Sequence, residues 1–177
     1  VGSEMCIRDR AELPCESWDL ALVRHWLYDR AEVLRWQSLE RSSNAGLAAL
    51  AARAMREESF HRTHAEMFLS RVTAVGGPGR EKIQAAVEEL LPVAVGLWDP
   101  VAGEAEALSD GVVTSSSEEL AIQWRTDVIA DLDRWGLATD WPTQGPEQSE
   151  RCRRSTGFAD FLTYLQEVVV VDRSATW

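Results

Sequence analysis

Residues 44–72 read NAGLAALAARAMREESFHRTHAEMFLSRV, with no proline among them. Apolar side chains recur in this stretch at spacings of three and four residues, which is the pattern of one face of an α-helix. Asn44 is a good N-cap, and the glycines after Val75 are typical of a helix stop. The stretch therefore predicts one long helix from about Asn44 to Val72.

Glu58 lies in the middle of the apolar stripe of this helix. At steps of about 100° per residue, six apolar residues lie within about 40° of it: Leu47, Ala51, Ala54, Ala65, Leu69 and Val72. Burying an ionised carboxylate is costly unless a proton, a cation or a metal accompanies it. His61 follows about 60° further round, so Glu58-Ser-Phe-His61 forms a Glu-x-x-His pair that can direct both side chains at one ion.

A second long helix is expected immediately upstream. The chain has no glycine or proline from Ser17 to about Glu40, Ser17 is a good N-cap, and Asp19 stands in the first turn. Its apolar residues recur at helical spacings and cover much of its circumference: Leu20, Leu22, Trp26, Leu27, Val33, Leu34 and Trp36. Arg41–Asn44 supplies a turn, so the two helices form an αα-hairpin.

The hairpin register selects partners for Glu58 and His61. Residues at equal distances from the turn share a height, and this places Glu32 beside Glu58 and Asp29 beside His61. In ferritin-like bundles, a Glu from one helix and a Glu-x-x-His pair from the next bind one metal ion. The candidate metal ligands are Glu32, Glu58 and His61, with Asp29 as the alternative acid.

A structural role for Glu58 stays open beside the metal role. A buried carboxylate can also be neutralised by an arginine, and both Arg62 and Arg35 are close enough in sequence to serve. A complete dinuclear site would need a second Glu and a second Glu-x-x-His pair, which the rest of the chain does not contain.

The remaining pattern is helical as well. Pro92 is expected to kink or shorten its helix, and no segment alternates with a period of two, so the class is all-α, with helices packed antiparallel as in a bundle. The expected elements are a helix over 81–96, a helix from 115–117 to about Trp135, an exposed loop over 140–155 and a short helix over 157–170.

Length and composition indicate one domain. The chain has 177 residues, of which 45% are hydrophobic, enough for a single core. Residues 1–10, VGSEMCIRDR, show no periodicity and are expected to be non-native, which leaves 11–177 as the domain. Eight tryptophans are present, and core packing is expected to account for Trp18, Trp26 and Trp36.

Charge and cysteine content exclude several classes of partner. With 18 Lys and Arg against 29 Asp and Glu, the net charge is −11, which opposes binding to nucleic acid and to anionic membranes. No apolar run is long enough to span a bilayer. The three cysteines have no metal-type spacing, so neither a disulfide framework nor a cysteine zinc site is expected, and a cytoplasmic location fits best.

Several segments resemble a known family. They are Trp26-Leu-Tyr-Asp29, residues 47–57 leading to Phe60-His61, residues 83–92, Leu97-Trp-Asp99 and residues 161–167. Residues 18–100 are similar to the PaaC-type chain of the bacterial multicomponent 1,2-phenylacetyl-CoA epoxidases, the Paa-type phenylacetate oxygenases. The resemblance implies a ferritin-like fold in a heteromeric complex for aerobic phenylacetate catabolism.

The resemblance also implies different functions for the subunits of the complex. In the family, a related catalytic chain of PaaA type binds two irons and epoxidises the CoA-activated ring, a reductase supplies electrons, and the PaaC-type chain is a scaffold that pairs with the catalytic one. A scaffold chain needs no cofactor of its own. The family chains begin with two further helices, so this chain is expected to form an incomplete bundle without its N-terminal helix pair.

One departure from the family keeps other functions open. The familiar scaffold form is usually not acidic at the positions of Glu32 and Glu58, and both are acidic here. This favours, as alternatives, a ferritin-like di-iron or di-manganese oxidase with its own metal site, or a helical interaction module unrelated to oxygenases.

Overall fold

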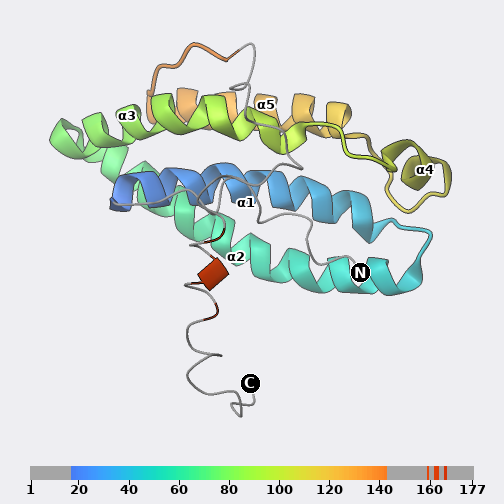
Figure 1. Cartoon of the computed structure of the whole chain (residues 1–177). Helices are drawn as coiled ribbons and strands as arrows, with labels where there is room; N and C mark the ends of the chain where they lie inside the picture. The colour runs from blue at the N-terminus through green and yellow to red at the C-terminus, as the bar shows by residue number, and fades with distance from the viewer. Residues whose placement is uncertain (1–16, 143–158, 160–161, 164–165, 167–177) are drawn as a thin grey trace.

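The computed structural model describes residues 17–142, together with residues 159, 162–163 and 166 (Figure 1). Every regular element in these residues is helical, which confirms the all-α class. The elements are α1 (Trp18–Glu40), α2 (Ala45–Val75), α3 (Gly77–Ala94), the 3-10 helix η1 (Val95–Trp98), α4 (Glu104–Ser109) and α5 (Ser117–Trp135).

Helix α1 is the central element of the bundle. It contacts α2, α3 and α5, and in Figure 1 it lies between α2 on one side and the pair α3 and α5 on the other. Its residues Val23, Trp26, Leu27 and Ala31 are buried, as expected for a helix that is apolar on more than one side. The acids that α1 carries on its inner faces are therefore enclosed by neighbouring helices.

Helix α2 begins at the predicted cap. The side chain of Asn44 accepts hydrogen bonds from the backbone N–H groups of Gly46 and Leu47, which satisfies donors that the first turn leaves free. The helix continues to Val75 and ends at Gly76, whose φ of 74° is disfavoured for residues with a side chain. The predicted antiparallel hairpin of α1 and α2 is confirmed.

Helix α3 starts earlier than the sequence predicts. It begins at Gly77 rather than Glu81, with Pro78 in its first turn, where proline loses no hydrogen bond because the first N–H groups have no partner within the helix. Pro92 does not end the helix. The α-helix runs on to Ala94 and then tightens into η1.

Helix α5 begins with a capping box. The Ser116 hydroxyl accepts from the Glu119 N–H, and the Glu119 carboxylate accepts from the Ser116 N–H. The short helix α4 was not predicted, because its six residues are too few to show a helical period. Glu104 of α4 accepts a hydrogen bond from the Ser117 N–H, so α4 is joined to the start of α5.

The core is rich in tryptophan, with one correction to the sequence analysis. Trp26 packs edge-on against Trp135 with ring centroids 5.0 Å apart, and the Trp124 indole donates to the Leu27 carbonyl at 3.0 Å. Trp18 was expected in the core and is instead about half exposed, because it is the first residue of α1. Trp36 is partly buried.

Two predicted segments lie mainly outside the described residues. Of the loop over 140–155, the structure describes residues 140–142. Of the helix over 157–170, it describes Ala159, Leu162, Thr163 and Gln166, all of which are helical. None of the helices in the described part of the chain is long and apolar enough to cross a membrane.

Candidate functional site

Three of the carboxylates in the α1–α2 hairpin influence one another. Asp29 and Glu32 on α1 are both buried, and the Glu58 side chain on α2 is 18% exposed. Burial raises the pKa of the Glu58 carboxyl above its usual value, and the charges of Asp29 and Glu32 raise it further, while His61 lowers it. The three acids are therefore near enough to interact electrostatically.

Each of two acids has a histidine one turn away on its own helix. His61 Nδ1 lies 3.7 Å from Glu58 Oε1, although the His61 side chain is 53% exposed. His25 Nδ1 lies 3.8 Å from Asp29 Oδ1, and the nearby Asp29 carboxylate raises the pKa of His25. The sequence analysis did not include His25 in the site. Its four-residue spacing from Asp29 was the signal available.

Glu32 has a counter-ion of its own. Arg35 Nη1 lies 2.6 Å from Glu32 Oε1, and Nη2 donates to the Leu97 carbonyl. The same guanidinium lies over the Trp98 ring, 4.9 Å from its centroid. Arginine is well suited to such a site because it combines planar stacking with several donors. Arg35 therefore neutralises Glu32 and joins α1 to η1.

Glu58 and Asp29 are less completely satisfied. Glu58 Oε2 and Asp29 Oδ2 are buried and accept no hydrogen bond within the described residues. Of the two arginines considered for Glu58, Arg35 pairs with Glu32 and Arg62 pairs with Glu66. The basic side chain that lies within 4 Å of Glu58 is His61, at 3.7 Å, and an imidazole is charged only when it is protonated.

The donor set suits a transition metal only in part. Carboxylate oxygens and imidazole nitrogens are ligands that iron and manganese accept, and the two unpartnered oxygens have the required chemistry. Across residues 17–142 and the few described beyond them, however, no group of three or more His, Cys, Asp or Glu side chains is arranged to hold an ion. Asp29, Glu58 and His61 thus supply donors without a closed set of ligands.

A third buried acid was not predicted from the sequence. Asp131 on α5 is fully buried and accepts from the Trp26 indole at 3.0 Å, from Arg30 Nε at 2.9 Å and from Arg134. Arg30 also lies 2.9 Å from Glu66 on α2. The available signal was its place on the helical stripe of Trp124, Val128 and Trp135. This network ties α1, α2 and α5 together.

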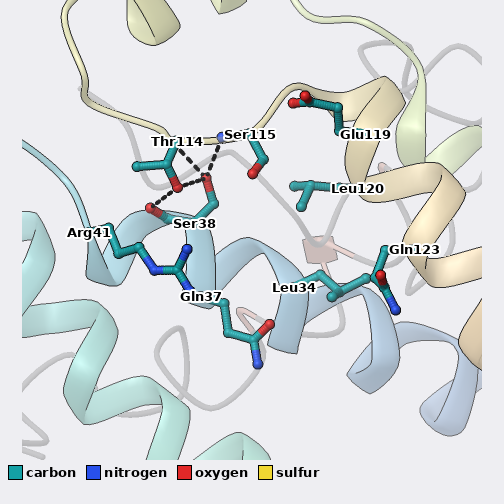
Figure 2. Close-up of a pocket in the computed structure, with 9 residues that line it drawn as sticks. All are labelled: Leu34, Gln37, Ser38, Arg41, Thr114, Ser115, Glu119, Leu120 and Gln123. Atoms are coloured by element: carbon teal, nitrogen blue, oxygen red, sulfur yellow. Dashed lines mark hydrogen bonds between the residues drawn. The ribbon is translucent and has the colours of Figure 1, made fainter.

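A polar cavity near the start of α5 is lined by side chains with a structural function. A cavity of about 240 Å³ lies between the second half of α1 and the start of α5 (Figure 2). Ser38 stands in its wall and accepts from the N–H groups of Thr114 and Ser115 at 2.9 and 3.2 Å. None of the hairpin acids lines it. Its hydrogen bonds fasten the segment before α5 to α1.

Comparison with known proteins then decides the family. Residues 6–177 match the family PaaA_PaaC, described as phenylacetic acid catabolic protein. The chain belongs to this family. The match includes residues 101–156, which the resemblance of the separate segments did not cover. The family is named for both PaaA and PaaC, so membership alone does not distinguish a catalytic from a scaffold subunit. No curated protein matches the chain.

Proposed function

We propose that this member of the phenylacetic acid catabolic family is a cytoplasmic scaffold subunit of a phenylacetyl-CoA epoxidase-type oxygenase. In this function it pairs with the catalytic di-iron subunit of the same complex and needs no cofactor of its own. The observation that supports the proposal most strongly is the pairing of Arg35 with Glu32.

The pairing with Arg35 favours a structural function for Glu32. Glu32 is the α1 carboxylate that the hairpin register places level with Glu58, and a metal ion bound by Glu32 would have to displace a guanidinium. That guanidinium is held by Glu32, the Leu97 carbonyl and the Trp98 ring. Removing one partner of a buried ion pair is strongly destabilising. The protein therefore supplies the positive charge itself at this position.

The buried Asp131 network supports the same function. Arg30 joins Asp131 of α5 to Glu66 of α2, and Trp26 fixes the other side of the carboxylate. The Asp131 carboxylate at the centre of this network accepts from three side chains, and satisfied buried polar groups help to specify one packing. A bundle fixed in this way keeps its outer helix faces in a constant arrangement. A scaffold subunit needs such constant faces to position a catalytic subunit.

A second candidate function is a ferritin-like oxidase with its own metal centre. It is favoured by the buried oxygens of Glu58 and Asp29 that accept no hydrogen bond among the described residues. Glu58, His61 and Asp29 would hold one iron or manganese ion, with Glu32 joining if Arg35 released it. A bound dinuclear cluster would supply oxygen activation.

Co-expression with the catalytic subunit of the same oxygenase tests the first proposal. The expected result is a stable complex of the two chains on size-exclusion chromatography, with epoxidation of phenylacetyl-CoA that falls when this chain is omitted. Two chains that elute separately, with epoxidation independent of this chain, would refute the scaffold function.

A further inference from the structure

Arg35 is a buried cation that is held from three directions. Its side chain is 10% exposed, and that of its partner Glu32 is 7% exposed. The guanidinium lies 2.6 Å from Glu32 Oε1, donates to the Leu97 carbonyl and stacks over the Trp98 ring. These contacts come from α1 and from η1, and together they use the donors and the flat face of the guanidinium. The charge of Arg35 therefore has a fixed position in the fold.

Glu32 belongs to a group of acids that interact with one another. Besides burial, the charges of Asp29 and Glu32 raise the pKa of the Glu58 carboxyl, while His61 lowers it. The basic groups next to Asp29 and Glu58 are histidines, which are charged only when protonated. Asp29 and Glu58 each have a buried oxygen that accepts no hydrogen bond in the part of the chain that the structure describes. Arg35 is thus the permanent positive charge that pairs with one member of this group.

The Arg35 guanidinium competes with any metal ion for Glu32. A Glu from one helix and a Glu-x-x-His pair from the next can bind one ion, and here these residues are Glu32, Glu58 and His61. The Glu32 carboxylate is already paired with Arg35, and a buried guanidinium repels a second cation nearby. Among the described residues, no three acidic, histidine or cysteine side chains are arranged to hold an ion.

We propose that Arg35 is an internal counter-ion that takes the place of a metal ion in the α1–α2 hairpin, and that its guanidinium prevents Glu32, Glu58 and His61 from binding one. This inference rests on the proposed function, for which it names the residue that keeps the chain free of metal. Without the charge of Arg35, Glu32 is a buried acid with no partner, which is strongly unfavourable. A divalent cation can then replace the lost charge.

The test measures Mn²⁺ binding to the purified full chain by electron paramagnetic resonance, in which the signal of the free ion falls as the ion binds. Arg35→Gln removes the charge and keeps a polar side chain. We expect this variant to bind about one Mn²⁺ per chain and to melt at a higher temperature when Mn²⁺ is added, because a ligand of the folded state stabilises it. The parent chain is expected to bind none.

Two matched controls separate the charge of Arg35 from a general loss of arginine. Arg35→Lys keeps a positive charge beside Glu32 and should bind no Mn²⁺. Arg62→Gln removes an arginine of α2 that pairs with Glu66, and it should also bind none, because Glu32 keeps its partner.

Double variants identify the ligand and check the fold. Arg35→Gln/Glu32→Gln removes both charges of the pair, so it should fold, as circular dichroism will show, and should not bind Mn²⁺. Arg35→Gln/Glu57→Gln changes an exposed acid next to Glu58 and should bind Mn²⁺ as Arg35→Gln does. If Arg35→Gln is unfolded without metal, we expect Mn²⁺ to fold it.

The possible results separate this inference from the proposed function. A folded Arg35→Gln that binds no Mn²⁺, or that still binds it after Glu32→Gln is added, overturns the inference and leaves the scaffold function standing. The same conclusion follows if Arg35→Gln stays unfolded with Mn²⁺ while Arg35→Gln/Glu32→Gln folds. Stoichiometric Mn²⁺ in the parent chain would contradict both the inference and a scaffold that needs no metal of its own.

Discussion

Glu58 occupies a position that its chemistry does not favour. Its carboxyl stands on the inner face of α2 beside two other acids, one of its oxygens accepts no hydrogen bond in the described residues, and its pKa is raised, chiefly by burial. Raised pKa values are frequent at functional sites but occur in structural ones as well. The pH dependence of the free energy of unfolding shows whether the ionised Glu58 carboxylate destabilises the fold.

Replacing Glu58 by glutamine is expected to stabilise the metal-free protein at neutral pH. Because the folded-state pKa is raised above 4.5, the folded state holds the proton more tightly than the unfolded state. The stability gained from this is fully present below pH 4.5 and is lost as the pH rises through the raised value. Glu58→Gln should therefore melt higher than the parent chain near neutral pH, and the difference should shrink on acidification.

Thermal melts after chelator treatment measure this effect, with the exposed neighbour substitution Glu57→Gln as the control. That control should show no comparable dependence on pH. A parent chain that melts higher than Glu58→Gln at neutral pH would mean that the ionised carboxylate has a stabilising partner, contrary to our description of Glu58.

Replacing Asp131 by alanine is expected to destabilise the fold strongly. The change removes the acceptor of the Trp26 indole and one of the counter-ions of Arg30. Breaking a buried ion pair from one side costs about 3–5 kcal/mol. Urea denaturation measures the loss, and Asp133→Ala, at an exposed position on the same helix, should change stability by less than about 0.5 kcal/mol. Equal effects from the two variants would contradict the description of Asp131.

At the scale of elements, local sequence signals predicted the long helices, misplaced the start of α3 and missed the short helix α4. Asn44 and the serines before Glu118 marked helix starts correctly, because capping is a short-range interaction. The start of α3 was misplaced because Pro78 and the glycines around it were interpreted only as a helix stop. Helix α4 was too short for a periodic signal.

The capping box of α5 gives a prediction at this scale. Ser116→Ala should lower the free energy of unfolding by about 1 kcal/mol, because the Glu119 N–H loses its acceptor. Ser117→Ala, one residue further along, is the control, because none of the described hydrogen bonds uses its hydroxyl. Chemical denaturation compares the two, and a Ser116 variant as stable as its control would show that the cap contributes nothing.

At the scale of the whole molecule, the sequence predicted which helices face each other but not which charges pair. The hairpin register brought Asp29, Glu32 and Glu58 to one region, because chain geometry near a turn is local. Arg35 lies three residues after Glu32, but the Leu97 carbonyl that anchors its guanidinium is 62 residues away, and Asp131 pairs with Arg30 across a separation of 101 residues. Such contacts have no signature in a single sequence.

We propose that this family member is a scaffold subunit that depends on a catalytic partner for its metal. The most direct test is elemental analysis of the full chain expressed with excess iron, alone and in the complex, with Glu58→Ala in parallel. Our account predicts that the isolated chain has no stoichiometric iron, that the iron of the complex belongs to the partner, and that Glu58→Ala changes neither value. Stoichiometric iron in the isolated chain, about one atom per chain and falling in Glu58→Ala, would contradict the scaffold function and favour the oxidase with its own metal centre.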